Sequence, residues 1–511
     1  MSELPARESL NVEFKGDTKK LPDRDLVLAV VCLANTDGGI VYLGVEDDGT
    51  VTGLHPEHRD VTGLAAMIAN RTTPPLSVRV ALLTLEGQPV ARIEVSRSER
   101  LVASSDGTLQ RRRLLADGRP ECVPFLPHEF ASRESDLRLS DYSALPVAGA
   151  TVADLDPLER QRVRQAIERY GGDRALLGLD DEGLDGAMGF TRTRAGVPVP
   201  TVTGLLLIGR EAALREHLPT HEAAFQQLDG TAVRVNDFFR WPLVRLFERL
   251  DELFRSGVTE LEVQAGLFRV PVPTVDPGAF REALVNALAH RDYTRLGAVH
   301  VRWSDEALTL SNPGGFVEGV TLENLLTVEP RPRNPLLADA LKRLGLAERT
   351  GRGVDLIFQG LLRYGRRAPD YSQSDRTGVT VSLSAGPADL AFLGLVLEQE
   401  ARTKSPLPVE SLLVLAALRH SRRLDVNEIA RVVQKPATAA RALLERLVES
   451  GLVQPHGQTR GRTYTLSPAV YRTLGQETGY VRQAGFDRLA LIREWYLVTR
   501  RSLEEATQAA P

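Results

Sequence analysis

The sequence predicts a multidomain α/β protein, and three observations support this prediction. The chain has 511 residues, more than one hydrophobic core accommodates, so roughly three to four domains are expected. Short apolar runs bounded by glycine turns, typical of strands, alternate with segments whose apolar residues recur at helical spacing. Near the C-terminal end, three helical segments are followed by a hairpin.

Composition and charge narrow the class of protein. The formal net charge is −4, so nucleic acid would have to be bound by local basic patches. The cysteines, Cys32 and Cys122, lack metal-ligand spacing and predict neither a disulfide framework nor a zinc site. The charged N-terminus and the absence of a run of ~18 apolar residues predict a soluble, cytoplasmic protein that contacts no membrane.

The N-terminal segment follows the order strand, helix, glycine turn, strand and tight turn. A helix ending near Ala34 separates the first strand from residues 36–39, and a buried strand over 40–45 precedes the turn at 47–50. Together with Glu13-Phe14-Lys15 and the run 44–49, this order resembles the Schlafen AlbA-type domain over roughly residues 3–130. We therefore expect a nucleic-acid-binding α/β module over residues 1–140.

Two interpretations remain open for the carboxylates of this module. In some Schlafen relatives a comparable set forms a metal-dependent RNA-cutting site, and converging carboxylates can hold divalent cations. Alternatively, Glu13 and Lys15 alternate with apolar residues on a half-exposed strand, while the aspartates make the hairpin turn. The carboxylates are Glu8, Glu13, Asp47 and Asp48, and the neighbouring candidates for nucleic-acid contact are Lys15, Arg111, Arg112 and Arg113.

Residues 281–293 predict a helix with a polar stripe. Glu282, Asn286 and His290 lie at i, i+4 and i+8, beside an apolar face. Two glycine-containing boxes follow, at 311–316 and 348–355, where the backbone could approach a ligand closely. This order resembles the GHKL ATPases, and most closely the branch with an Asn-Pro-Gly-Gly box found in bacterial transcriptional regulators.

The GHKL resemblance covers roughly residues 275–385, and we expect an α/β sandwich over 261–386 that binds ATP and Mg²⁺. It implies that Glu282 is the general base and that Asn286 is the magnesium ligand. Asn312 stands where the superfamily uses an aspartate to read adenine, and its side-chain oxygen can accept the same hydrogen bond. The remaining nucleotide-binding candidates are His290, Gly314, Gly315, Gly351 and Gly353, with Arg331 and Arg333 in a loop able to close on phosphates.

The connector over residues 150–260 shows no catalytic grouping. Asp156 and Pro157 predict the start of a helix. The apolar run 202–208 favours a buried strand, and apolar residues at helical spacing predict a helix over about 240–255.

The C-terminal segment has the layout of a winged helix-turn-helix over residues 405–475. Helices are expected over 409–419, 425–433 and 437–450, with a hairpin over 452–466. Such modules bind DNA or other proteins. The candidate DNA contacts are Thr438, Arg441 and Arg446 on the third helix and Arg460 and Arg462 on the wing, and a last helix is expected within 476–511.

These patterns favour an intracellular ATP-binding, DNA-binding protein that regulates transcription or a stress response, with DNA affinity modulated by nucleotide. A weak ATPase activity and a homodimer are expected, and RNA could replace DNA as the partner. Two alternatives stay open. One is a metal-dependent nuclease acting in defence or damage response, and the other is a scaffold whose GHKL-like domain has lost catalysis.

Overall fold

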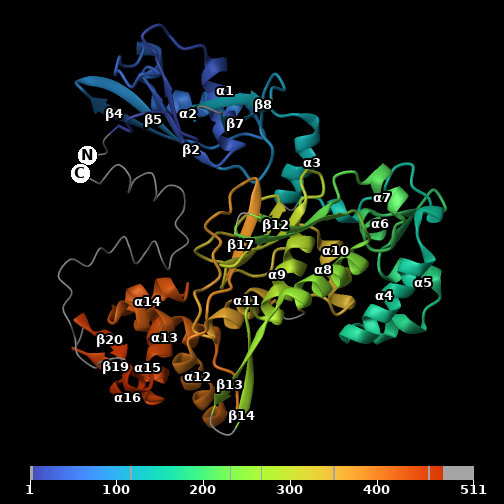
Figure 1. Ribbon diagram of the computed structural model, residues 1–511. Coiled ribbons are helices and arrows are strands. Elements are labelled where there is room, and N and C mark those ends of the chain that lie inside the picture. Colours follow the sequence, from blue (N-terminus) through green and yellow to red (C-terminus); the bar gives the residue numbers. More distant parts are fainter. Residues whose placement is uncertain are drawn as a thin grey trace. The chain divides into compact units, whose positions relative to one another are not determined.

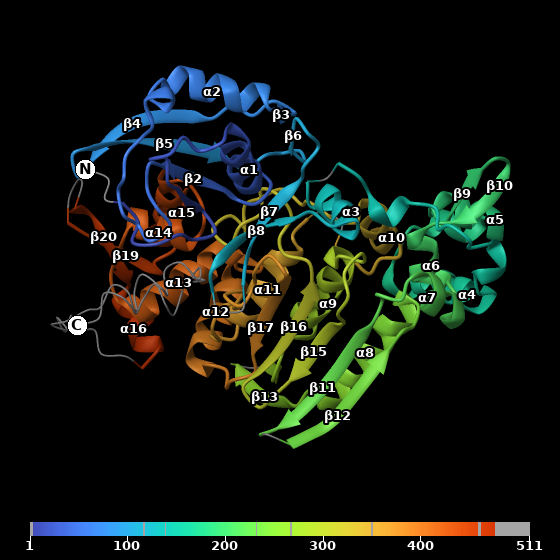
Figure 2. The same ribbon diagram turned by 90° about the horizontal axis from the view of Figure 1, so that it is seen from above.

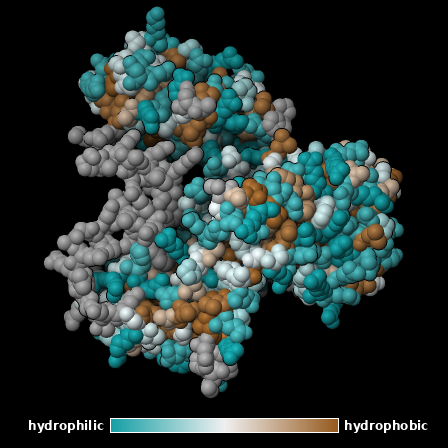
Figure 3. Space-filling model, viewed as in Figure 1, coloured by the Kyte–Doolittle hydropathy of each residue, from teal (hydrophilic) through white to brown (hydrophobic). Residues whose placement is uncertain are grey.

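The computed structural model describes residues 4–115, 118–137, 139–230, 232–265, 268–348, 351–457 and 461–475 (Figure 1). The chain divides into two compact units, Met1–Ser140 and Asp141–Pro511. Within the described residues, no helix is long and apolar enough to cross a membrane. On the face drawn in Figure 3, hydrophilic side chains predominate and apolar ones occur in small groups.

The first unit is built on a four-stranded sheet with the order β1-β2-β5-β4. Strand β1 is parallel to β2, and the other pairs are antiparallel. Helix α1 packs its apolar residues on this sheet, and the expected order of strand, helix, turn and strand is confirmed. The elements are β1 (Val12–Lys15), α1 (Asp23–Ala34), β2 (Gly38–Leu43), α2 (Val61–Asn70), β3 (Thr72–Thr73), β4 (Arg79–Leu85), β5 (Gln88–Ser96), β6 (Ala103–Ser104), β7 (Gln110–Leu114), β8 (Pro120–Pro124) and α3 (Pro127–Asp136).

A disulfide joins Cys32 of α1 to Cys122 of β8. The expectation that the two cysteines would stay unpaired is therefore wrong. Strand β8 pairs with β7, which packs against α1, so residues 90 positions apart in sequence have Cα atoms 6.0 Å apart. Their approach is a tertiary event that spacing along the chain does not reveal. No cluster of three metal-ligating side chains occurs in the described part of the chain.

The second unit begins with a mainly helical segment. Asp156 accepts a hydrogen bond from the backbone N–H of Leu158, and Pro157 is the first residue of α4, as expected. The elements up to residue 273 are α4 (Pro157–Tyr170), α5 (Asp181–Ala187), β9 (Thr191–Arg194), β10 (Val197–Pro200), α6 (Val202–Ile208), α7 (Glu211–His217), β11 (Ala223–Asp229), β12 (Ala232–Phe239), α8 (Leu243–Gly257), β13 (Glu260–Ala265) and β14 (Phe268–Pro273).

The strand expected over residues 202–208 is wrong, because this run forms helix α6. The hydroxyl of Thr201 accepts a hydrogen bond from the backbone N–H of Gly204 and caps the helix. Every residue of α6 is buried, so the segment has no polar face. A short apolar run without periodicity cannot be assigned to a strand or a helix from its pattern.

A five-stranded sheet with the order β12-β11-β15-β16-β17 forms the centre of the second unit. Helices α8, α9 and α11 cover one of its faces, as seen in Figure 2. Alternate residues of β15 face this helical layer, among them Val301 and Trp303. The remaining elements here are α9 (Pro277–His290), β15 (Val299–Trp303), β16 (Ala307–Pro313), α10 (Pro335–Arg343), α11 (Gly353–Leu362), β17 (Gly378–Ser384) and α12 (Leu390–Thr403).

In its described part, the C-terminal module, residues 409–473, contains four helices and a three-stranded sheet with the order β18-β20-β19. Three helices followed by a hairpin are found as the sequence predicts. The elements are α13 (Val409–Ser421), β18 (Leu424–Asp425), α14 (Val426–Val432), α15 (Ala437–Glu449), β19 (Val453–His456), β20 (Thr463–Leu466) and α16 (Pro468–Thr473). The helix expected within residues 476–511 lies outside the described residues.

Candidate functional site

Helix α9 carries the predicted polar stripe. The carboxylate of Asp276 accepts a hydrogen bond from the backbone N–H of Ala279, and Pro277 is the first helical residue, which fixes where the helix begins. Glu282 is buried, whereas Asn286 and His290 are partly exposed. The three side chains therefore share one side of a helix that is otherwise packed against the sheet and α11.

The N-terminus of α11 meets this stripe at Gly353. A β-carbon added to Gly353 would lie 2.7 Å from Glu282 Oε2 and 3.7 Å from Asn286 Nδ2. Any larger residue at position 353 would therefore displace the Glu282 carboxylate. The glycine brings the free N–H groups of a helix N-terminus close to a carboxylate and an amide, two of the groups that the sequence places in a nucleotide site.

Burial raises the pKa of Glu282 to about 7, Arg281 opposes this shift, and Glu348 adds to it. Glu348 lies near the same helix end, where its Oε2 accepts a hydrogen bond of 3.0 Å from the backbone N–H of Arg352. At neutral pH a carboxyl with this pKa is partly protonated, and it gains the capacity to accept a proton as pH rises. This is the pKa range suited to a general base.

Replacing Glu282 by glutamine is expected to stabilise the protein at about pH 8 by on the order of 1–3 kcal/mol, with little effect at about pH 5. The folded-state pKa lies above the ordinary value, so the folded state retains a proton that the unfolded chain releases. The native glutamate therefore lowers stability as pH rises through this interval. Thermal unfolding at both pH values measures the difference. The exposed Glu262→Gln is the control, and equal shifts at both pH values for Glu282→Gln would contradict the expectation.

The glycine box follows the end of β16. Asn312 is buried, and its Nδ2 donates to the backbone oxygen of Pro313 over 3.3 Å. Gly314 has a φ of +94°, and its N–H donates to the oxygen of Thr377 over 2.8 Å. A β-carbon on Gly315 would lie 2.5 Å from the backbone oxygen of Asp375. Glycine is thus required at position 314 by the positive φ and at position 315 by the close approach of the segment before β17.

Arg333 lies in the expected loop, but its side chain is buried. It is 2% exposed, its Nε donates to the oxygen of His290 over 3.1 Å, and its Nη2 donates to the oxygen of Gly315 over 2.7 Å. This guanidinium ties the end of α9 to the glycine box. The sequence gives no sign of this burial, because it shows only an arginine in a proline-rich segment. Arg331 donates to the oxygen of Glu318 over 3.0 Å from the same loop.

Burial lowers the pKa of His290 to about 4, and the charges of Arg333 and Lys342 act in the same direction. The imidazole is therefore neutral at physiological pH. A neutral ring offers one donor and one acceptor instead of a positive charge. His290 would consequently contact a nucleotide through a hydrogen bond and not through charge.

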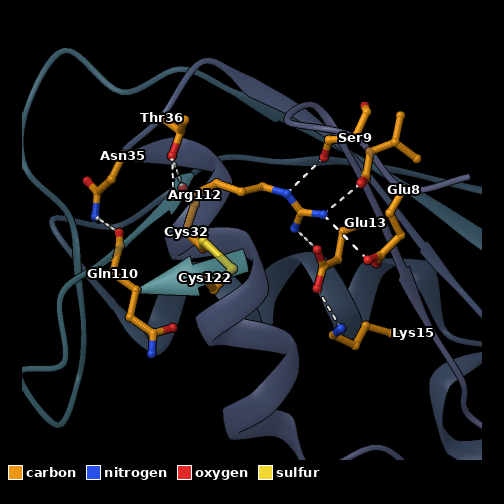
Figure 4. The surroundings of a disulfide bond; sticks show 11 residues. Glu8, Ser9, Glu13, Lys15, Cys32, Asn35, Thr36, Gln110, Arg112 and Cys122 are labelled. Carbon is orange, nitrogen blue, oxygen red and sulfur yellow. Dashed lines mark hydrogen bonds and ion pairs between the residues drawn. A yellow bond between two sulfur atoms is a disulfide. The ribbon is translucent and has the colours of Figure 1, made fainter. Parts of the chain in front are cut away.

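In the first unit, Arg112 lies between the two glutamates of the suggested nuclease group (Figure 4). It is 3% exposed, and it forms an ion pair with Glu13 and lies 3.8 Å from Glu8 Oε2. Its Nε and Nη2 also donate to the backbone oxygens of Ser9 and Val12, over 2.9 and 3.0 Å. A guanidinium thus occupies the place where a cation shared by Glu8 and Glu13 would lie.

The other members of the N-terminal group are also engaged. Asp48 Oδ1 accepts a hydrogen bond of 2.9 Å from the backbone N–H of Thr50, which makes the turn after Asp47. Arg111 pairs with Glu129, Arg113 with Glu121, and Lys15 with Glu13. The positive charges proposed for nucleic-acid contact are therefore largely compensated within the unit.

Sequence reasoning missed the role of Arg112, although a signal was present. Residues 110–114 form strand β7, in which successive side chains point to opposite faces. Arg112 must then point away from its two arginine neighbours, and the structure places it inward against α1 and β1. A period of two in Arg111-Arg112-Arg113 could have identified the central residue as the buried one.

In the C-terminal module, the predicted contacts on α15 are exposed. Thr438, Arg441 and Arg446 all lie on the solvent side of this helix, and Arg462 is exposed before β20. No ion pair involves Arg441 or Arg446 in the part of the chain that the structure describes. Arg460 lies outside the described residues, as do residues 349 and 350 of the glycine-containing box at 348–355.

Three family models match parts of the chain. Residues 8–114 match the family described as "Schlafen, AlbA_2", and residues 297–383 match HATPase_c_4, described as "Putative ATP-dependent DNA helicase recG C-terminal". Residues 131–224 match a domain of unknown function. The HATPase_c_4 match includes Asn312 and Gly353 but begins after α9. The structure connects α9 to it through the Glu282–Gly353 approach and the Arg333–His290 hydrogen bond.

The chain is similar over most of its length to a solved structure. The DIP2311 protein from Corynebacterium diphtheriae is 25% identical, and the alignment covers 91% of this chain and 94% of that chain with a TM-score of 0.53. The N-terminal domain of a RecG-related protein from Nitrosomonas europaea is 24% identical over 18% of this chain and 65% of that chain, with a TM-score of 0.15. No curated protein matches.

The chain therefore contains a Schlafen AlbA_2 domain and an HATPase_c_4 domain, and its fold class is multidomain α/β as the sequence predicts. These two domains support a protein that binds ATP and nucleic acid.

Proposed function

We propose that this chain, which joins a Schlafen AlbA_2 domain to an HATPase_c_4 domain, is a regulator whose affinity for DNA depends on bound ATP. The observation that carries the proposal is the approach of Gly353 to Glu282 and Asn286. A helix N-terminus, a carboxylate and a neutral amide converge there. Backbone N–H groups suit phosphate oxygens, and the amide oxygen suits a magnesium ion.

The donor set fits ATP with Mg²⁺. Asn286 would hold the metal, the N–H groups at the start of α11 would hold phosphates, and Asn312 would accept a hydrogen bond from adenine. When bound, Mg²⁺ would neutralise phosphate charge and polarise the terminal phosphoryl group. Glu282 would accept the proton of an attacking water at its carboxylate. We propose a slow ATPase whose rate rises with pH as Glu282 loses its own proton.

We propose that the C-terminal module binds the DNA and that it is a winged helix-turn-helix. Helix α15 presents Thr438, Arg441 and Arg446 to solvent, and its apolar side packs into the module. Exposed arginines on one helix suit phosphate contact and guanine recognition. We further propose a homodimer, since paired modules would read two half-sites of a duplex.

Fluorescence anisotropy with a labelled DNA duplex tests this proposal. We expect the affinity of the full-length protein to change when Mg²⁺ and a non-hydrolysable ATP analogue are added. Replacing Arg441 and Arg446 together by alanine should lower the affinity and reduce its salt dependence by up to about two phosphate contacts. Arg269→Ala, on the exposed hairpin β13–β14, is the control. The proposal would be contradicted if the wild type bound DNA equally well with and without the analogue and if the double variant bound DNA as tightly as the wild type.

A further inference from the structure

The turn between α14 and α15 is hydrogen-bonded to the loop that follows the glycine box. Gln434 lies in this turn, and its Oε1 accepts a hydrogen bond of 2.8 Å from the backbone N–H of Leu326. Its Nε2 donates to the backbone oxygen of Leu322 over 2.9 Å. One side chain of the C-terminal module thus uses its acceptor and its donor to hold the backbone of the loop over residues 316–334.

Both ends of this loop lie at the candidate nucleotide site. Its first residues continue from Gly315, whose backbone oxygen accepts a hydrogen bond from Arg333 near the other end. Close to that end, Pro330 packs on the glycine-containing box at 348–355, since a β-carbon on Gly351 would lie 2.5 Å from the Pro330 Cγ. A ligand that changes the spacing of these boxes would therefore change the loop that Gln434 holds.

A second connection leaves the same turn. Lys435 forms an ion pair with Glu410 at the start of α13. Both charges act on Asp355 in the first turn of α11, where burial and Glu410 raise its pKa and Lys435 lowers it. In addition, Gln359 of α11 donates to the backbone oxygen of Leu407 over 3.2 Å, just before α13. The turn is thus linked to the nucleotide site through the loop and through α11.

The backbone at Gln434 is held in an unusual conformation. Its φ is +53°, in the left-handed region that glycine and asparagine adopt more readily than glutamine does. If the position only had to form a turn, glycine or asparagine would adopt this conformation with less strain. The glutamine side chain spans the distance to Leu322 and Leu326, and this gives a physical reason for its presence at a strained position.

We propose that Gln434 is the contact through which nucleotide occupancy reaches the turn between α14 and α15. The inference rests on the proposed function, since it assumes that ATP binds near Gly353. In the structure, the loop over 316–334 is hydrogen-bonded to the turn through Gln434. A nucleotide that draws the loop toward its phosphates must pull on, or break, the two hydrogen bonds of Gln434, and α15 begins directly after this turn. Coupling of this kind needs only an element with two arrangements that both sites bias.

Two substitutions remove the contact while preserving the turn. Gln434→Gly removes both side-chain hydrogen bonds. Because glycine adopts a positive φ readily, the fold of the module should persist. Gln434→Asn also tolerates this conformation, but its side chain is one methylene shorter. Gln454→Ala, an exposed glutamine on β19 of the same module, is the matched control.

The experiment is amide hydrogen exchange on the full-length protein, with and without Mg²⁺ and a non-hydrolysable ATP analogue. Without nucleotide, we expect the Leu326 amide to exchange about fivefold or more faster in Gln434→Gly than in wild type, because its acceptor is gone. With analogue, wild type and Gln454→Ala should change exchange in both 316–334 and 426–449. Gln434→Gly and Gln434→Asn should respond as the wild type does in 316–334 but less than the wild type in 426–449, where only the link through α11 remains.

Calorimetry with the same analogue separates failure of this inference from failure of the proposed function. Binding by all four proteins, with the response of residues 426–449 unchanged in both Gln434 variants, would overturn the inference alone. Unchanged Leu326 exchange in Gln434→Gly would overturn it as well. Absence of analogue binding by the wild type would overturn the proposed function and the inference together.

Discussion

Replacing Asn286 by alanine is expected to weaken magnesium-dependent binding of a fluorescent ATP analogue by about tenfold or more. Asn286 is one turn beyond Glu282 on α9, and its amide lies near the start of α11. A small side chain there offers no oxygen to a hard cation. Since the residue is only partly buried, its loss should leave the fold intact.

Fluorescence titration at several magnesium concentrations measures this effect. Asn236→Ala, on the exposed edge strand β12, is the matched control and should bind as the wild type does. Without magnesium, wild type and Asn286→Ala should bind the analogue with similar, weak affinities, because the amide contributes to binding only through the metal ion. A change of less than about twofold in the presence of magnesium would remove Asn286 from the proposed site.

Arg112→Ala is expected to destabilise the first unit by about 3–5 kcal/mol. The substitution leaves Glu13 buried without its guanidinium partner and removes the hydrogen bonds to Ser9 and Val12. By contrast, Arg113→Ala breaks a pair whose side chains are 51% and 47% exposed, so a loss of about 0–1 kcal/mol is expected. The two neighbouring arginines should therefore differ strongly.

Urea-dependent amide exchange over residues 12–15 and 38–43 measures the stability of this unit in the full-length chain. These strands form the parallel pair next to the Arg112 contacts. If Arg112→Ala and Arg113→Ala lowered the stability of the unit equally, the buried contacts of Arg112 would not stabilise it more than the exposed pair of Arg113 does. Cleavage of RNA or DNA gained in Arg112→Ala with manganese would revive the nuclease alternative.

Much of the fold could be predicted because its local signals agree with its tertiary structure. Helix α9 has the apolar face that the sequence predicts, and helix α4 has the predicted cap at Asp156 and first-position proline at Pro157. The hairpin of the C-terminal module follows three helices with recognisable ends. Helix α6 was assigned wrongly because it is apolar on every side, so only tertiary packing distinguishes it from a strand.

The candidate site was predictable in its composition but not in its contacts. Glycines near a helix start indicate close backbone approach, and Gly353 does approach Glu282. Three contacts join segments that lie far apart in sequence. They are the hydrogen bond from Arg333 to His290, the disulfide between Cys32 and Cys122, and the hydrogen bond between Leu326 and Gln434. Such contacts depend on how elements pack, and no local pattern encodes them.

The most direct test of the nucleotide site is calorimetry of the full-length wild-type protein with a non-hydrolysable ATP analogue, in magnesium and in a metal chelator. We expect saturable binding of one analogue per chain that is strengthened by magnesium, because the start of α11 at Gly353 approaches Glu282 and Asn286 of α9. No binding in either condition would contradict the assignment, and these glycines and polar residues would then serve only the packing of the domain.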